Sequence, residues 1–212
     1  MHILLTDLLT CPRCGPDFGL IVLSDRLAER QVLEGSLGCA NCRLIYPIHG
    51  GVADLRWAGA GELIDAATDP ADPDRPIRIA ALLGITRPNA TILILERSGA
   101  TAAGVTPLIP DVHVIGGSGV DVSDNAEAPQ GILSRVMLGG SLPFRTGGLA
   151  GLAAVGIDIR GLLGEVRRIL RPDGRIVVEA APGDLPGMLR DAGFEVHLEQ
   201  DGVVVASPVG RS

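Results

Sequence analysis

Four cysteines near the start of the chain are the residues best suited to chemistry. They form two pairs, Cys11 with Cys14 and Cys39 with Cys42, and 24 residues separate the pairs. Each Cys-x-x-Cys turn can direct two sulfurs at one point, so two turns complete a tetrahedron around a metal ion about 2.3 Å from each sulfur. Because the chain has no further cysteine, we expect a closed structural zinc site rather than a catalytic one with an open position.

Other uses of these cysteines fit the sequence less well. Two disulfides would need an oxidising compartment, and the first residues, Met-His-Ile-Leu-Leu-Thr-Asp, lack the basic start of an export signal. A redox dithiol usually has one Cys-x-x-Cys at the start of a helix. Iron stays open as the metal, since tetrahedral sulfur sites accept it. His49 follows the second pair, but a full tetrahedron leaves it as a turn residue.

Short strands must hold the two cysteine turns in place. The apolar runs at residues 20–23 and 31–37 predict two strands, and residues 24–30 are expected to form the turn between them. A unit of this size has little core of its own. Metal binding, worth about 10–16 kcal/mol in zinc-finger peptides, is therefore expected to decide whether it folds.

The sequence around the cysteines carries a resemblance. Residues 8–14 are Leu-Leu-Thr-Cys-Pro-Arg-Cys, and the second pair is followed by Tyr-Pro-Ile-x-x-Gly-Val at residues 46–52. Over residues 1–56 this pattern resembles the small zinc-ribbon activators of methyltransferases. The resemblance implies a ribbon that binds a methyltransferase catalytic subunit, extends its sheet and covers its apolar surface.

A larger unit follows the ribbon. We expect residues 1–57 to form the zinc ribbon, residues 58–76, rich in Gly, Pro and Asp, to form a linker, and residues 77–212 to form an α/β domain. Unbroken apolar runs are typical of strands that are buried on both faces of a parallel sheet. In chain order the pattern predicts a helix at 77–83, strands at 91–95, 112–115, 132–138 and 149–155, a helix at 161–170, a strand at 175–179, a helix at 184–192, and a hairpin of 194–199 with 203–206. The expected fold is a Rossmann-like, mostly parallel sheet with an antiparallel C-terminal hairpin.

Three segments of this second unit, residues 142–149, 165–175 and 189–196, are similar to class I S-adenosylmethionine-dependent methyltransferases. The resemblance implies a cofactor at the carboxyl ends of the first strands. It also implies three groups that bind this cofactor. A glycine-rich loop after the first strand faces the methionine part, an acid at the end of the second strand binds the ribose, and an acid after the third strand binds the adenine.

These cofactor-binding groups are incomplete in the sequence. Glu96-Arg97-Ser98-Gly99 follows the first strand, with one glycine where the family has three. By spacing, the second strand ends at Gly116-Gly117 without an acid, whereas a rival register would make Asp121 the ribose ligand. Gly139-Gly140-Ser141 stands where the family has its second acid. The candidate cofactor-binding residues are therefore Ser98, Gly99, Gly116, Asp121 and Gly140.

No other catalytic arrangement is evident, and no residue is predicted to be catalytic. The glycines at 116–119 lack the lysine of a phosphate-binding loop. The four histidines, His2, His49, His113 and His197, are scattered along the chain and support no Ser–His–Asp arrangement.

Composition indicates which classes of partner the protein can bind and in which compartment it is expected. The net charge of −7, from 25 acids and 18 bases, argues against binding to nucleic acid. No uncharged stretch approaches the about 20 residues of a membrane span, and we expect a cytoplasmic protein with no membrane contact. A mean hydropathy of +0.34 with 20% charged residues favours an apolar surface that contacts a protein partner or a second copy.

The sequence keeps segments similar to the methyltransferase scaffold but lacks several of the groups that would bind S-adenosylmethionine, and this combination leads to a hypothesis for function. The protein is expected to be a zinc-binding, non-catalytic methyltransferase-like protein that acts as an adaptor or stabilising subunit in a complex. The alternative is an active methyltransferase that holds S-adenosylmethionine in an altered pocket, with Asp121 at the ribose and the backbone of residues 98–101 at the methionine part.

Overall fold

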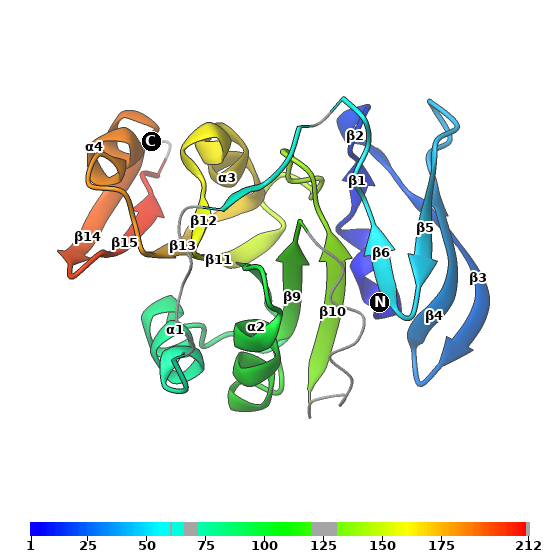
Figure 1. Ribbon diagram of the computed structural model, residues 1–212, viewed down its shortest axis with the longest axis horizontal. Coiled ribbons are helices and arrows are strands. Elements are labelled where there is room, and N and C mark those ends of the chain that lie inside the picture. Colours follow the sequence, from blue (N-terminus) through cyan, green and yellow to red (C-terminus); the bar gives the residue numbers. More distant parts are fainter. Residues whose placement is uncertain (60, 66–71, 120–130, 211–212) are drawn as a thin grey trace.

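The computed structural model describes residues 1–59, 61–65, 72–119 and 131–210, and its centre is a sheet of 11 strands. In space the strands follow the order β14-β15-β13-β11-β8-β9-β10-β6-β5-β4-β3. The sheet therefore runs without a break from the C-terminal hairpin to the N-terminal ribbon (Figure 1). The fold is mixed α/β, with a small β-rich N-terminal region and a mostly parallel central sheet, as the sequence predicts.

The N-terminal region supplies one end of this sheet. It contains the 3-10 helix η1 (Ile3–Asp7) and the strands β1 (Thr10–Cys11), β2 (Gly15–Gly19), β3 (Ile21–Ala28), β4 (Gln31–Gly38), β5 (Ile45–His49) and β6 (Val52–Asp54). Strands β3 to β6 are antiparallel neighbours in the large sheet, whereas β1 and β2 form a two-stranded sheet of their own. The cysteine turns lie at strand ends, because Cys11 ends β1 and Cys39 follows β4.

The central strands are parallel, and apolar residues dominate them. They are β8 (Thr91–Leu95), β9 (His113–Ser118), β10 (Ile132–Met137), β11 (Leu149–Val155) and β13 (Leu170–Glu179), and the antiparallel hairpin of β14 (Phe194–Gln200) and β15 (Val203–Pro208) pairs with β13. In β8 the four residues after Thr91 are all buried, as expected for a strand with both faces covered. The strands predicted at residues 91–95 and 149–155 are confirmed at these bounds.

Helices cover both faces of the parallel strands (Figure 1). One face carries α1 (Arg75–Leu83), α2 (Ala100–Val105) and the 3-10 turn η2 (Thr106–Leu108), and the other carries η3 (Arg160–Leu162), α3 (Leu163–Ile169) and α4 (Leu185–Asp191). Helix α1 ends where the sequence predicts, because Gly84 takes a left-handed φ of 59° and its amide donates to the Ala80 carbonyl. No helix in the described part of the chain is both long and apolar enough to cross a membrane.

The apolar core on the α3–α4 face continues into the ribbon. It joins Leu9 and Tyr46 of the ribbon to Leu93 of β8 and Val166 of α3. The α1–α2 face has a separate core, which includes Ile79 of α1. The ribbon and the central sheet therefore share one of the two cores as well as one sheet.

The turn predicted at residues 24–30 is wrong. Strand β3 continues to Ala28, and the hairpin turns through Glu29 and Arg30 alone, whose φ values of 47° and 68° are both positive. Two residues with positive φ are typical of the turns that join twisted antiparallel strands. The polar residues at 24–26 suggested a loop, but on an exposed edge strand such residues face the solvent.

Two further boundaries differ from the prediction by more than two residues. Strand β13 begins at Leu170 rather than at residue 175, and the helix predicted at 161–170, which begins at Leu163, therefore ends at Ile169. Strand β9 extends to Ser118, three residues past the predicted end. This second difference matters for the site, since it places Gly116 and Gly117 inside the strand.

Residues 58–76 contain structure of their own. Strand β7 (Ile64–Asp65) pairs with β12 (Ile157–Asp158), Glu62 forms a β-bridge with Gly139, and α1 starts at Arg75. This connecting segment therefore crosses the carboxyl edge of the sheet. The division of the chain at residues 57 and 76 stays a prediction.

Candidate functional site

The four cysteines form a compact cluster. Their sulfur atoms all lie within 4.8 Å of one another, and the Sγ–Sγ distances are 3.6 Å from Cys11 to Cys42 and 3.8 Å from Cys14 to Cys39. Four sulfurs about 2.3 Å from a central metal would be about 3.8 Å apart, whereas a disulfide would need about 2.05 Å. The arrangement fits a tetrahedral metal ion and excludes disulfide pairing in this structure.

Local turn geometry brings the sulfurs together. The Cys14 amide donates to Cys11 Sγ at 3.4 Å, which closes the first turn. In the second turn the Arg43 amide donates to the Cys39 carbonyl at 2.9 Å, with Arg43 in the left-handed region at φ 61°. Each pair is thus shaped by contacts within four or five residues, the first pair between β1 and β2 and the second between β4 and β5.

Two side chains contact the sulfurs from outside the cluster. The Tyr46 hydroxyl lies 3.5 Å from Cys11 Sγ, and the Asn41 amide donates to Cys14 Sγ at 3.4 Å. Burial opposes ionisation of the Cys11 thiol. The hydrogen bonds from Tyr46 and from the backbone at Cys14 and Arg13 outweigh it, and they lower the pKa of Cys11 to about 7. A lowered pKa favours the thiolate, which is the form that binds metal.

The second region of interest is the turn after β8. Glu96 is 3% exposed, and its carboxylate accepts hydrogen bonds from the amides of Thr101 at 2.9 Å and Ala102 at 2.7 Å. These amides belong to the first turn of α2, so the carboxylate caps that helix. The space between Glu96, Gly99, Gly116 and the start of α2 has no volume for a water molecule.

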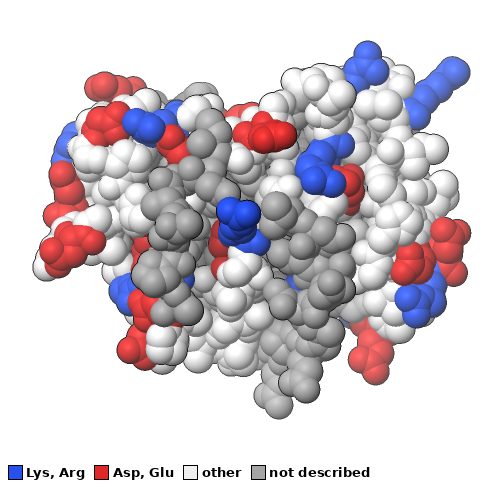
Figure 2. Space-filling model, viewed as in Figure 1, with Lys and Arg blue, Asp and Glu red and all other residues white. Residues whose placement is uncertain are grey.

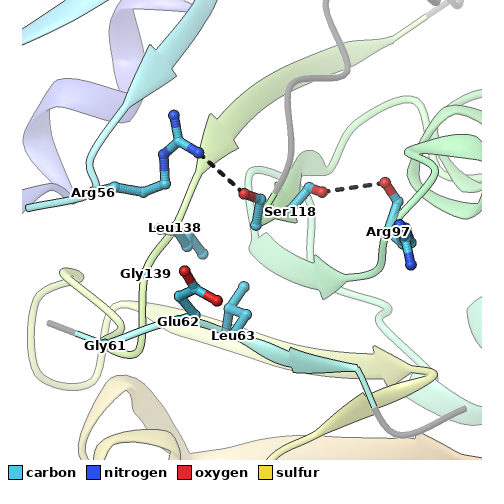
Figure 3. Close-up of a pocket in the computed structure, with 9 residues that line it drawn as sticks. Arg56, Gly61, Glu62, Leu63, Arg97, Ser118, Leu138 and Gly139 are labelled. Atoms are coloured by element: carbon cyan, nitrogen blue, oxygen red, sulfur yellow. Dashed lines mark hydrogen bonds between the residues drawn. The ribbon is translucent and has the colours of Figure 1, made fainter.

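A cavity of about 290 Å³ lies beside this turn, at the carboxyl ends of β8, β9 and β10 (Figure 3). Its lining residues are Arg56, Gly61, Glu62, Leu63, Arg97, Ser118, Gly119, Leu138 and Gly139. Ser118 Oγ donates to the Arg97 carbonyl at 3.2 Å, and Arg56 donates to the Gly119 carbonyl at 3.3 Å while it pairs with Asp54 at 2.7 Å. Small-molecule sites have volumes of about 300–1,000 Å³, so this cavity is at the lower limit.

The structure brings Gly99 and Gly116 together beside the start of α2, but none of the described candidate cofactor-binding residues lines the cavity of about 290 Å³. Gly99 starts α2 and Ser98 Oγ accepts from the Ala100 amide, so both serve the helix start. Gly116 lies inside β9, where a Cβ atom would stand 3.2 Å from Ala102 Cβ, so this glycine permits close packing of α2. The Gly140 amide donates to the Gly61 carbonyl at 3.1 Å, on another wall. Asp121 lies outside the described residues.

Sequence reasoning missed the residues that close the cavity. Arg56 comes from the end of the ribbon, and Glu62 and Leu63 come from the connecting segment. Their local sequence gives no signal of this role. Arg56 reaches the crevice because β6 pairs with β10, and Glu62 and Leu63 reach it because residues 62–65 pair with Gly139 and with β12. Arg97, from the segment that follows the first strand of the central sheet, also lines the cavity.

The junction between the ribbon and the central sheet is paired along its length. Strand β6 lies parallel to β10, with Ala53 opposite Val136. Leu9 forms a β-bridge with Phe144, and the Thr10 amide donates to the Pro143 carbonyl at 2.8 Å. The ribbon thus extends the central sheet at β10 in the same chain.

A buried polar cluster forms part of this junction. Ser134 Oγ accepts from the His2 amide at 2.9 Å and lies 2.8 Å from His113 Nε2, and the two imidazole rings meet edge to face at 5.7 Å. Burial lowers the pKa of His113 to about 4, and the nearby His2 adds to the shift. His113 is therefore neutral and has a structural role at neutral pH.

Comparisons with known proteins agree with both regions. The family model for Trm112p-like proteins matches residues 2–51. A putative S-adenosyl-L-methionine-dependent methyltransferase from Methanococcus maripaludis shares 13% identity at a TM-score of 0.50, over 66% of this chain and 86% of that chain. A geranyl diphosphate methyltransferase in complex with SAM shares 14% identity at a TM-score of 0.50, over 71% of this chain and 97% of that chain.

A further solved structure pairs two proteins of these kinds. The complex between the Haloferax volcanii Trm112 methyltransferase activator and a putative methyltransferase shares 13% identity at a TM-score of 0.48, over 65% of this chain and 90% of that chain. Comparison with curated sequences finds no significant match. At these identities the structures show the fold alone. Together with the match at residues 2–51 and the cysteine cluster, the fold shared with the two structures at a TM-score of 0.50 fits a zinc ribbon fused to a methyltransferase-like domain.

Proposed function

We propose that this protein is a non-catalytic methyltransferase-like protein, stabilised by its own fused zinc ribbon, that acts as an adaptor or stabilising subunit in a protein complex. The observation that carries the proposal is the position of Glu96. Its buried carboxylate takes the two backbone amides that begin α2.

Glu96 opposes cofactor binding in two ways. The resemblance to class I methyltransferases implies that the backbone of this turn approaches the methionine part of the cofactor. Here the Thr101 and Ala102 amides already have an acceptor, so they have no proton left to donate to a ligand. A ligand carboxylate at this turn would also face the Glu96 carboxylate, and two like charges in a buried place repel strongly.

The other strand ends support the same conclusion. Strand β9 ends in Gly116-Gly117-Ser118 and offers no carboxylate for ribose hydroxyls. Gly139 and Gly140 follow β10 and are engaged by the connecting segment. Among the described residues that line the cavity, Glu62 is the one acid, and it comes from that segment rather than from a strand end.

The pairing of β6 with β10 supports the stabilising role of the ribbon. The resemblance to zinc-ribbon activators implies a ribbon that extends the sheet of a methyltransferase. In this chain the ribbon extends the sheet of the domain to which it is fused, and Phe144 and Leu9 are fully buried between them.

Apolar surface on the ribbon supports the adaptor role. Ile45, Leu23 and Ile21 are 69%, 63% and 58% exposed, and the β-ladders place Ile21 and Ile45 on either side of Gly38. The ribbon side of the molecule also shows a broad area without charge between charged ends (Figure 2). Exposed apolar area of this kind favours contact with another protein.

Calorimetric titration of S-adenosylmethionine into the zinc-loaded full chain tests the proposal. We expect no saturable heat, because the Thr101 and Ala102 amides already have an acceptor and the described end of β9 offers no acid to the ribose. Micromolar binding together with methyl transfer to any acceptor would overturn the proposal. Binding without transfer would leave the non-catalytic role standing but contradict the argument from Glu96.

The alternative function is an active methyltransferase with an altered pocket. The cavity of about 290 Å³ at the carboxyl ends of β8, β9 and β10 favours it, since ligands of open α/β sheets bind at this edge. It would use Asp121 at the ribose and the backbone of residues 98–101 at the methionine part. The same titration decides between the two, and Asp121→Asn would then abolish the binding.

We also propose that Cys11, Cys14, Cys39 and Cys42 hold one structural zinc ion. Four thiolates in a closed tetrahedron are the donor set of structural zinc sites, and the sulfur separations fit that geometry. Metal analysis of the purified protein should give about one zinc per chain. Iron in its place would show as a coloured protein, and four alkylatable thiols without metal would overturn the proposal.

A further inference from the structure

We propose that Tyr46 is a positioning residue of the cysteine site, whose hydroxyl donates a hydrogen bond to Cys11 Sγ and thereby sets the affinity of the site for its metal. The inference rests on the proposed zinc site and adds a residue outside the four ligands. Tyr46 is the one tyrosine of the chain.

The hydroxyl of Tyr46 is held in place by its surroundings. Tyr46 lies on β5, is 2% exposed and pairs with Leu37 on β4, two residues before Cys39. Its oxygen lies 3.5 Å from Cys11 Sγ and also interacts with the backbone at Arg13. Because the Arg13 amide can only donate, the phenolic proton is left to point at the sulfur.

Cys11 needs such a donor more than the two partly exposed ligands, Cys14 and Cys42, do. Four thiolates around a divalent ion carry a net charge of −2, and each sulfur must be stabilised by water or by a protein donor. Cys11 is 1% exposed and Cys39 3%, whereas Cys14 and Cys42 are partly exposed. Water does not reach Cys11, so the Tyr46 hydroxyl and the Cys14 amide supply its hydrogen bonds.

Packing alone does not explain a tyrosine at this position. A phenylalanine would fill the same apolar space, whereas a buried hydroxyl costs free energy unless it has a partner. The partners of this hydroxyl are the sulfur of Cys11 and the backbone of Arg13, both in the first cysteine turn. Tyr46 therefore ties that turn to the strand that precedes β6 and the junction with β10.

The test is Tyr46→Phe in the full chain, which keeps the ring and removes the hydroxyl. We expect zinc affinity, measured by competition with a chromophoric chelator, to fall by about 10- to 100-fold, the range for lost partners of metal ligands. In the cobalt-substituted protein, the sulfur-to-metal charge-transfer band should move to longer wavelength, because a sulfur without its hydrogen bond gives up electrons more easily. An unchanged affinity and an unchanged band would overturn the proposal.

Two controls separate positioning from ordinary packing. Asn41→Ala removes the donor to Cys14, which is exposed enough for water to replace it, so a smaller loss of affinity is expected. Urea unfolding of Tyr46→Phe with and without zinc gives the second control. A merely structural role would lower the free energy of unfolding equally in both states and leave zinc affinity unchanged, and this result would overturn the proposal.

A second substitution keeps the test decisive if Tyr46→Phe does not fold. Global incorporation of 3-fluorotyrosine changes this one residue and keeps its hydroxyl, which becomes a stronger donor. The cobalt band should then move to shorter wavelength, opposite to the phenylalanine variant, and no movement would overturn the proposal. If the wild-type chain binds neither zinc nor cobalt, the zinc site itself fails, and that outcome is distinct from a failure of Tyr46.

Discussion

The cysteine cluster and the crevice at the carboxyl edge belong to the same sheet, but they differ in what their scaffolds hold. In the ribbon, the turns that resemble a known family carry all four of the expected ligands, with sulfurs within 4.8 Å of one another. In the crevice, the strands of the methyltransferase-like fold are in place, while Glu96 occupies the helix amides and glycines stand at the ends of β9 and β10. Under the proposed function, this domain keeps the fold for its packing and not for binding a cofactor.

The difference also shows where each region obtains its stability. The ribbon shares the apolar core of the α3–α4 face, and in the proposed zinc site the metal adds to its stability. In the crevice, Ser118, Arg56 and Gly140 make hydrogen bonds to neighbouring backbone carbonyls. The two regions are joined through β6 and β10 and through one apolar core. A substitution that destabilises one region is therefore expected to change the unfolding of the other.

The largest effect is expected from removing a metal ligand. Cys39→Ser should abolish the single zinc ion and unfold the ribbon, since zinc binding contributes about 10–16 kcal/mol in comparable sites. Zinc content and far-ultraviolet circular dichroism measure the two losses. His49→Ala is the matched control, because His49 is exposed and outside the cluster, and it should keep the metal. A Cys39→Ser protein that kept its full zinc content would show that Cys39 is not a ligand and would contradict the proposed four-cysteine site.

A smaller effect is expected at the junction. Phe144 is fully buried opposite Leu9, so Phe144→Ala should lower the free energy of unfolding by about 3–5 kcal/mol. Phe18→Ala is the control, because Phe18 is 41% exposed, and its expected effect is within about 0.5 kcal/mol. If the two regions are one cooperative unit, fluorescence of the single Trp57 and circular dichroism will give the same urea midpoint. Separate midpoints would show that the shared sheet does not couple them.

Acid should weaken the same junction through His113. Burial lowers its pKa from 6.5 to about 4, so below pH 6.5 the unfolded chain takes up a proton that the folded protein does not. The free energy of unfolding should therefore fall with pH, by about 1 kcal/mol at pH 5.5 and about 3 kcal/mol in total by pH 4 from His113 alone. Urea midpoints at pH 7 and pH 5.5 measure this fall. His113→Gln should make it shallower, while burial also lowers the pKa values of His2 and of the Met1 amino group, which keep part of it. An equally steep fall in that variant would assign the effect to these other groups.

The smallest effect is expected from Glu96 in the crevice. Glu96→Leu leaves the buried amides of Thr101 and Ala102 without an acceptor, at a cost of about 1–3 kcal/mol. Glu96→Gln keeps one acceptor oxygen and should cost less. Thermal unfolding of both variants beside the wild type checks the order. Equal stability of all three would mean that Glu96 does not hold the helix start, and the crevice would then be open to a ligand after all.

Local patterns predicted much of this fold. The spacing of Cys11, Cys14, Cys39 and Cys42 predicted the cluster, because each turn closes through contacts within four or five residues. The strands at Thr91–Leu95 and Leu149–Val155 were predicted at their bounds, since unbroken β-branched and small apolar runs fit a sheet covered on both faces. The turn at residues 24–30 was not, because a polar edge strand and a polar loop look alike in sequence.

The cavity could not be predicted in the same way. Its walls include Arg56, Glu62 and Arg97, which come from three separate parts of the chain. Their meeting depends on β6 joining β10 and on the return of residues 61–65 to Gly139 and β12. These pairings are long-range, and no periodicity near Arg56 or Glu62 marks them.

For this protein the sequence by itself determined the four-cysteine cluster and the class of the fold. These properties depend on residue type and on spacing over a few residues, which the chain carries at every stage of folding. The tertiary structure decided that the ribbon extends its own domain, that Glu96 turns inward to cap α2, and that Tyr46 meets Cys11. Each of these depends on which surfaces are buried together, and burial is settled only when distant segments pack against one another.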